Sequence, residues 1–167
     1  IEDSVDAFPL DYGNGFTVEL TGETIRVTGC SSTCPSDLVI PDTIAGKSVT
    51  AIGNNAFEDS QLTSLILGDN LINIGSYAFR NNQLTTVIIP DGVTFIGERA
   101  FYVNQISDLV IGAGVSSIGS EAFRTNQLTE ISFFGDRPLF NGDSFYTLDE
   151  TSIRYCAAQP GWPGNAI

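Results

Sequence analysis

The stretch that decides the fold runs from Val49 to Phe134 and begins VTAIGNNAFEDSQLTSLIL (residues 49–67). Within it an Ile-Gly pair is followed, after two intervening residues, by an Ala-Phe pair, and this arrangement occurs four times. The isoleucines of these pairs stand 22 residues apart, at Ile52, Ile74, Ile96 and Ile118. A fixed period of about 20 to 50 residues is typical of a solenoid or another repeat array. The sequence therefore predicts stacked coils of 22 residues each.

Two further sets of residues keep the same period. A Gln-Leu or Gln-Ile pair recurs, and an apolar or nearly apolar triplet such as Leu65–Leu67 follows each pair. Side chains alternate between the two faces of a strand, so the outer members of each triplet are expected to point inward and the middle member outward. One coil cannot bury its own aliphatic side chains, but stacked neighbours can. The aromatic residues of the Ala-Phe pairs should fill the interior as one column: Phe57, Phe79, Phe101 and Phe123.

Each coil should also contain a second short extended segment, a bend and one helical turn. In one repeat these are Leu71–Ile74, Gly75, which tolerates a bend that a side chain would resist, and Ser76–Phe79. The asparagines that precede the Gln-Leu pairs, such as Asn82, are expected to hydrogen-bond the backbone of turns. A recognition role for these asparagines is the alternative.

The repeat pattern divides the chain into four segments. Residues 1–15 are polar and acidic and are expected to be a lead-in. Two alternating runs across a glycine-containing turn predict a β-hairpin, which we place over residues 16–37 as an N-terminal cap. The solenoid is expected over residues 38–134. The pattern decays over residues 135–167, which are expected to form a C-terminal cap.

The charge balance excludes several classes of partner. The chain has 20 acidic and 7 basic residues, a formal net charge of −13. Nucleic acid and anionic membrane surfaces are bound by clustered Lys and Arg, so neither is expected as a partner. No apolar run approaches the roughly 18 residues that span a bilayer, so membrane insertion is not expected either. Cations and basic proteins remain possible partners, although solubility alone is a common reason for such a charge.

Three cysteines are present, and two of them lie close together. Cys30 and Cys34 are separated by Ser-Ser-Thr, a spacing that allows a short disulfide loop. Two free thiols are an alternative, and a zinc site is another, although three cysteines without histidine make a poor ligand set. Cys156 is expected to be a small buried apolar residue near the C-terminus.

The residue types that most enzymes need are missing. The chain has no histidine, which excludes Ser-His and Cys-His nucleophile pairs, and Lys47 is its only lysine. It also contains no phosphate-binding loop of the Walker or dinucleotide type. Two carboxylates at the separation used by glycosidases remain an alternative, but a short solenoid offers a shallow face. We predict no enzyme, no cofactor and no metal site.

The best candidate for a binding surface is the outward face of the repeat strands. The triplets and the residues before them give two outward rows: Ser64, Thr86, Asp108 and Glu130 in the first, and Ile66, Ile88, Val110 and Ser132 in the second. The second row is an apolar stripe three residues long, and such patches often mark interaction sites. The alternative is that β-branched residues simply suit strands. The adjacent acids of the first row favour a basic partner or a cation, or are merely solvated.

The repeated motifs Leu-x-x-Leu-x-Leu, Ile-Gly-x-x-Ala-Phe and Asn-Gln-Leu resemble the BspA-type leucine-rich repeat. The flanking stretches, Leu38–Gly53 and the Gly161-Trp162 ending, resemble the first repeat and the C-terminal cap of that family. The resemblance covers roughly residues 16–164. It implies an α/β, β-dominated, right-handed leucine-rich-repeat solenoid with a strand ladder on one face.

Members of that family are bacterial or protist surface and secreted proteins, often implicated in adhesion and in binding host or matrix proteins. The resemblance supplies no catalytic motif. It implies an extracellular or cell-surface binding module, without enzymatic activity, that recognises a protein or a glycan through the strand face. The alternative is a structural subunit of a self-associating extracellular assembly.

Overall fold

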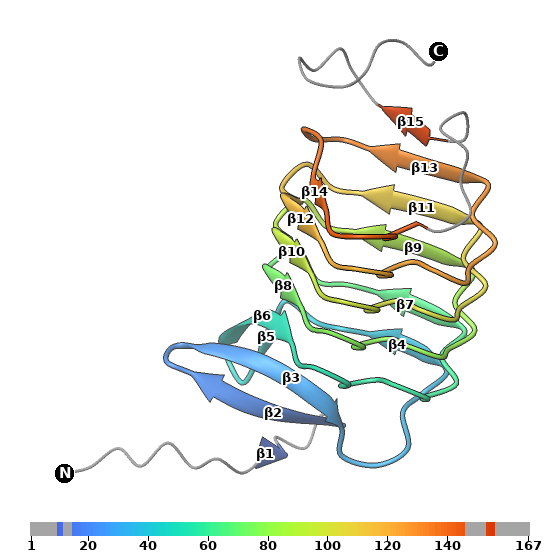
Figure 1. Cartoon of the computed structure of the whole chain (residues 1–167). Helices are drawn as coiled ribbons and strands as arrows, with labels where there is room; N and C mark the ends of the chain where they lie inside the picture. The colour runs from blue at the N-terminus through green and yellow to red at the C-terminus, as the bar shows by residue number, and fades with distance from the viewer. Residues whose placement is uncertain (1–9, 12–14, 146–152, 156–167) are drawn as a thin grey trace.

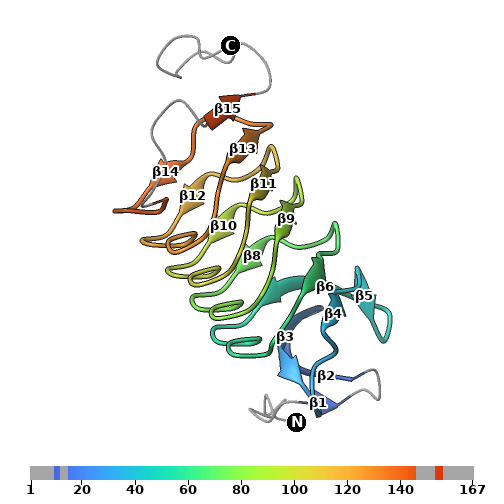
Figure 2. The same ribbon diagram turned by 90° about the vertical axis from the view of Figure 1, so that its right-hand side faces the viewer.

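The chain winds into a stack of coils whose short strands form two ladders along the stack (Figures 1 and 2). The computed structural model describes residues 10–11, 15–145 and 153–155, and the side chains of residues 15–145. Cys156, most of the predicted lead-in and the end of the predicted C-terminal cap lie outside the described residues.

The first ladder is a nine-stranded sheet. Its strands pair in parallel from β3 onward, whereas β1, β2 and β5 pair with their neighbours in antiparallel orientation. In pairing order they are β1 (Leu10–Asp11), β2 (Phe16–Thr21), β3 (Thr24–Cys30), β6 (Lys47–Ile52), β8 (Asn73–Ile74), β10 (Phe95–Ile96), β12 (Ser117–Ile118) and β14 (Leu139–Phe140), with β5 (Thr43–Ile44) beside β6.

The second ladder carries the apolar triplets. Its strands pair in parallel, and from β7 onward partners lie 22 residues apart, as Asp108 and Glu130 do. The strands are β4 (Asp37–Val39) and β7 (Ser64–Ile66), which form one sheet, and β9 (Thr86–Ile89), β11 (Asp108–Ile111), β13 (Glu130–Phe133) and β15 (Ile153–Tyr155), which form another. The predicted second extended segment, Leu71–Ile74, ends in β8 of the first ladder.

The core lies between the two ladders and contains the predicted aromatic column. Phe57, Phe79, Phe101 and Phe123 are all buried. Successive rings stack almost parallel with centroids 5.4, 5.1 and 5.1 Å apart, and Phe145 continues the column at 5.3 Å from Phe123. The inward positions of the triplets are buried as well, except that Leu65 is only half-buried. The prediction of an interior aromatic column is therefore confirmed.

The predicted helical turns are wrong, because no helix occurs among residues 15–145. In the segment Ser76–Phe79, the amide of Tyr77 donates to the carbonyl of Glu98 in the next coil at 2.9 Å, and that of Phe79 donates to Ala100 at 2.8 Å. Tyr77 also has a φ of 59°. A right-handed helix needs negative φ and hydrogen bonds within its own segment. The described part of the chain is consequently all β rather than α/β.

The predicted asparagine row hydrogen-bonds the backbone between coils. The side chain of Asn104 is buried and accepts a hydrogen bond from the amide of Leu84 at 3.2 Å. Its Nδ2 donates to the carbonyls of Phe79 and Phe101 at 3.0 and 3.2 Å. Asn82 and Asn126 make the equivalent bonds in their coils. These side chains satisfy buried polar backbone groups, which supports the structural interpretation of the row.

The glycine of each Ile-Gly pair is required for close packing of coils. A Cβ added at Gly97 would lie 2.4 Å from the backbone nitrogen of Ser76 and 2.6 Å from the carbonyl carbon of Gly75. Gly119 meets the backbone of the preceding coil in the same way. The predicted reason, a bend that a side chain would resist, is therefore replaced by the contact between backbones of adjacent coils.

The N-terminal end of the stack holds the predicted hairpin and a disulfide. Strands β2 and β3 form an antiparallel pair, and β3 joins the first ladder through β6. Cys30 and Cys34 are bonded to each other with their Cα atoms 5.4 Å apart. The hairpin and the disulfide pairing are thus both present, and the alternatives of free thiols and a zinc site do not apply to this pair.

Candidate functional site

The strand face, defined as the outward side chains of β4, β7, β9, β11 and β13, bears the predicted apolar row. Ile66 and Ile88 are 62% and 61% exposed, whereas Val110 and Ser132 are partly covered. The pairing register adds Val39, 52% exposed, directly beside Ile66. The sequence reasoning missed Val39, although its place in the triplet Leu38–Ile40 was a sufficient signal. The apolar row consequently runs across four coils.

The other predicted row of the strand face is polar and lies beside the apolar one. Ser64, Thr86 and Asp108 are exposed and Glu130 is partly covered. The register adds Asp37 beside Ser64, whose hydroxyl donates to the Asp37 carboxylate at 2.9 Å. The structure therefore brings all eight predicted site residues onto one face, in the two rows that the period predicted.

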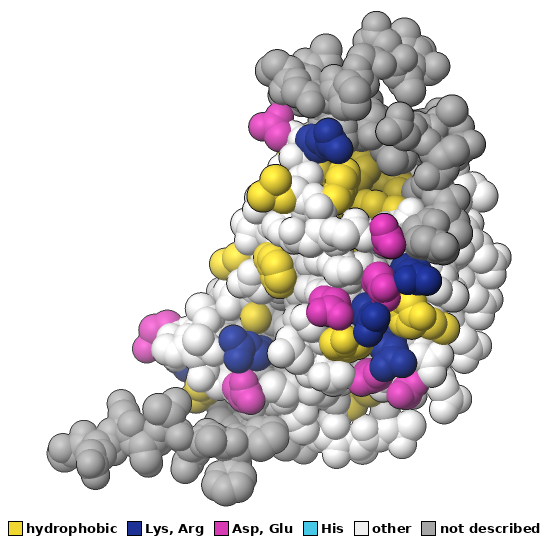
Figure 3. All heavy atoms as spheres, viewed as in Figure 1, with side chains coloured by type: hydrophobic (Ala, Val, Ile, Leu, Met, Phe, Trp, Pro, Cys, Tyr) yellow, Lys and Arg dark blue, Asp and Glu magenta, His cyan; other side chains and the backbone are white. Residues whose placement is uncertain are grey.

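A second cluster, which we call the turn flank, lies on the turns that connect the ladders and was not predicted. It consists of two columns with the 22-residue spacing and one additional acid: Tyr77, Arg99 and Glu121; Glu58, Arg80, Tyr102 and Arg124; and Glu98. Figure 3 shows basic and acidic side chains gathered over these turns, with hydrophobic ones between them.

Opposite charges are paired within the turn flank. Arg80 binds Glu58 at 2.7 Å, and Glu121 accepts from both Arg99 at 2.7 Å and Arg124 at 2.8 Å. The guanidinium groups of Arg80 and Arg99 each lie 5.7 to 5.9 Å from the centroids of two tyrosine rings, those of Tyr77 and Tyr102. Cation–π contacts of this kind add to the ion pairs. The turn flank therefore links four successive coils through side chains that satisfy one another.

The stabilising effect of the turn flank should depend on pH through Glu121. The hydrogen bond from Arg99 lowers the pKa of the Glu121 carboxyl below its ordinary value of 4.5, and the charges of Arg99 and Arg124 act in the same direction. A carboxyl with a lowered pKa stabilises the fold above its unfolded-state pKa, and this contribution is lost as the pH falls through the folded-state value. Glu121→Gln should therefore lower the urea midpoint at pH 7, and the difference from wild type should close below about pH 4. A difference that persists unchanged at pH 3 would contradict this role.

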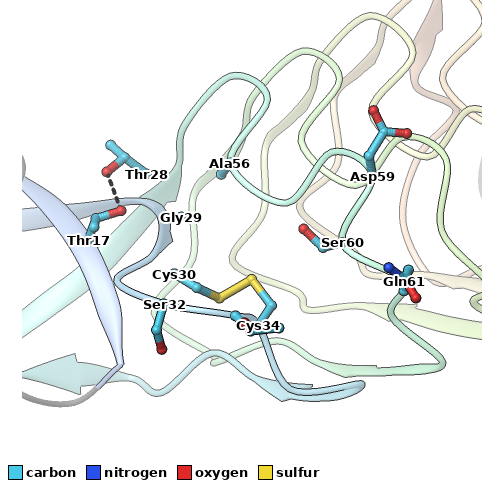
Figure 4. Close-up of a pocket in the computed structure, with 11 residues that line it drawn as sticks. Thr17, Thr28, Gly29, Cys30, Ser32, Cys34, Ala56, Asp59, Ser60 and Gln61 are labelled. Carbon is cyan, nitrogen blue, oxygen red and sulfur yellow. Dashed lines mark hydrogen bonds between the residues drawn. A yellow bond between two sulfur atoms is a disulfide. The ribbon is translucent and has the colours of Figure 1, made fainter.

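One hollow of about 410 Å³ opens beside the disulfide (Figure 4). It lies between the hairpin and the turn at Ala56–Gln61, and its lining is mostly polar. Thr28 donates to Thr17 across its rim at 3.1 Å, and the carboxylate of Asp59 accepts from Asn81. The described part of the chain contains no group of three His, Cys, Asp or Glu residues that could hold a metal ion. None of the helix-free segments between residues 15 and 145 is a candidate membrane-spanning helix.

Comparison with known proteins identifies the repeat. The family model of the BspA type leucine rich repeat region matches residues 31–156 in six copies. A search of curated proteins gave no match.

Solved structures of bacterial repeat proteins share the fold. A leucine-rich repeat protein from Bacteroides capillosus ATCC 29799 is 23% identical with a TM-score of 0.58, over 72% of this chain and 95% of that one. The T. pallidum leucine rich repeat protein is 20% identical with a TM-score of 0.53, over 83% of this chain and 90% of that one. A leucine-rich repeat protein from Eubacterium ventriosum ATCC 27560 is 26% identical with a TM-score of 0.52, over 59% of this chain. The match spans only 25% of that protein's length.

Proposed function

The chain belongs to the BspA-type leucine-rich repeat family, and from this premise we propose that it is a non-enzymatic module that binds a protein or a glycan through its strand face. The observation that carries the proposal is the row Val39, Ile66, Ile88, which is more than half exposed on regular parallel strands. Contiguous apolar side chains exposed in this way often mark interaction sites. The family as a class points in the same direction, since leucine-rich repeats commonly serve as interaction scaffolds.

We further propose that the module works at the cell surface or outside the cell. The Cys30–Cys34 disulfide supports this location, because disulfides persist mainly in oxidising compartments. The right-handed winding and the division into a lead-in (1–15), an N-terminal cap (16–37), a solenoid (38–134) and a C-terminal cap (135–167) belong to the same proposal.

A second candidate function, self-association into a surface assembly, is favoured by exposed apolar side chains on the other ladder. Phe95 and Leu139 stand in one column of that ladder, on either side of Ser117, and are 42% and 73% exposed. They offer a second surface through which copies of the chain can associate. Light scattering that finds only monomers at high concentration would remove this candidate.

Changing Ile88 to aspartate should abolish ligand binding while the fold is retained. Ile88 is 61% exposed, so the new carboxylate remains in water in the free protein and becomes buried only in the complex. Labelled wild type and Ile88→Asp are compared on arrays of immobilised peptides and glycans. We expect the signals that depend on the strand face to fall at least roughly tenfold.

The matched control is Phe95→Asp, which makes the same kind of change on the other ladder. It should leave these array signals unchanged, and circular dichroism should show that both variants fold. Equal loss in the two variants, or no loss in either, would refute a binding role for the strand face.

A further inference from the structure

Resting on the proposed function, we infer that the ligand of the strand face is a positively charged protein segment with apolar side chains, and not a glycan. The inference depends on where the uncompensated charge lies, on what stands beside the apolar row, and on how the nearby hydroxyl groups are already used.

The uncompensated charge of the described residues is carried by aspartates. Every ion pair between them joins an arginine or lysine to a glutamate: Arg26 to Glu19, Lys47 to Glu23, Arg80 to Glu58, Arg99 to Glu98 and Glu121, and Arg124 to Glu121. None of these pairs includes an aspartate. With a net charge of −13 for the whole chain, the cations are thus already engaged and the aspartates are available to an external cation.

Two of these aspartates stand next to the apolar row. Asp37 and Asp108 are exposed and lie two positions before Val39 and Val110 on the same strands, a separation of about 7 Å. Hydroxyl groups donate to both carboxylates, but each keeps its full charge. Outward positions from β4 to β13 hold neither lysine nor arginine. The strand face therefore presents an acidic row parallel to an apolar row, with Arg154 in register beyond Ser132 at its C-terminal end.

The hydroxyl groups nearest to this face are used within the protein. Thr63, Ser107 and Thr129 each donate to a backbone carbonyl of the preceding coil, at 3.3, 3.4 and 3.2 Å. Their protons are consequently engaged, and they offer a ligand only acceptor capacity. No aromatic side chain stands at the outward positions of β4, β7, β9, β11 and β13 on which a sugar ring could stack. The aliphatic row gains instead from apolar side chains of a partner.

The two rows define the shape of that partner. Adjacent coils are about 4.8 Å apart, so the apolar row from Val39 to Val110 extends about 14 Å along the stack. A segment that lies along the stack, with apolar side chains on one edge and lysines or arginines on the neighbouring edge, satisfies both rows. Charge complementarity of this kind speeds association and excludes partners of the wrong sign.

Three synthetic peptides of equal length and equal apolar content test the inference. Their polar positions carry lysine, glutamine or glutamate, and binding to the full chain is measured by titration calorimetry in 50 and 300 mM salt, concentrations on either side of about 0.15 M. The lysine peptide should bind most tightly, and more weakly at high salt. The double variant D37N/D108N should weaken it roughly tenfold. The matched control D136N/D143N removes two exposed aspartates outside the strand face and should change affinity less than about twofold.

The outcomes separate this inference from the proposed function. Equal weakening in both double variants would show non-specific attraction to an acidic protein and would overturn the inference. Equal binding of the glutamine and lysine peptides, lost in Ile88→Asp, would overturn the cationic partner but leave the strand face as a protein-binding site. Loss of lysine-peptide binding in Ile88→Asp, despite its added negative charge, together with loss in D37N/D108N alone, supports both. Peptide binding that Ile88→Asp leaves unchanged would overturn both.

Discussion

Replacing Phe101 with alanine is expected to destabilise the protein by about 3 to 5 kcal/mol. The ring is fully buried and stacks on Phe79 and Phe123 with both centroids 5.1 Å away. The substitution therefore removes two ring contacts and leaves a cavity between three coils. Each coil of a solenoid is stabilised mainly by its neighbours, so the loss acts on both interfaces at once.

Denaturant unfolding followed by circular dichroism measures this loss. The matched control is Phe95→Ala, because Phe95 is 42% exposed on the first ladder and has water on one side already. It should cost far less than Phe101→Ala. Similar losses for the two variants would mean that the aromatic column does not hold the coils together.

The period of the sequence accounts for most of the fold. It places each aliphatic residue of a triplet above its counterpart in the next coil, and the observed pairs Asp108 with Thr86 and Asp108 with Glu130 follow that spacing. The same arithmetic predicted the two rows of the strand face. An inward or outward assignment needs only the alternation of a strand, so it could be made without coordinates.

The turns were harder to predict, because their conformation is set by the neighbouring coil. Tyr77, Arg99 and Glu121 share one turn position and have φ values of 59°, 51° and 55°. Such values are uncommon for residues other than glycine, and nothing in the sequence Ser76–Phe79 indicates them. Amides that bond to the next coil hold the turn in this conformation. Local propensity favoured a helical turn, and the contacts between coils overrode it.

The turn flank could have been found with the same 22-residue spacing. Positions 77, 99 and 121 hold Tyr, Arg and Glu, and positions 58, 80, 102 and 124 hold Glu, Arg, Tyr and Arg. A search for identical residues misses such columns, because their members complement one another instead of repeating. Complementary columns hold coils together as the identical ones do, and this is why the turn flank is best interpreted as stabilising.

Replacing Asn104 with aspartate is expected to destabilise the protein by about 3 kcal/mol or more. The buried amide donates to the carbonyls of Phe79 and Phe101 and accepts from the amide of Leu84. A carboxylate keeps the acceptor but cannot donate, so a buried negative charge would face two carbonyl oxygens. Because the ionised form is disfavoured there, the pKa of the new carboxyl should be raised. Protonation restores one donor, and the loss relative to wild type should shrink as the pH falls from 8 to 4.

The neighbouring residue provides the control for this variant. Gln105 is exposed on the same coil, and Gln105→Glu makes the same change of amide to carboxylate in water. It should cost less than about 0.5 kcal/mol at pH 8, since surface substitutions rarely cost more. A loss of comparable size at both positions would reduce the effect to added negative charge on an acidic protein. A large loss at Asn104 alone, relieved by acid, would show that one amide per coil supplies the hydrogen bonds that the turns cannot make for themselves.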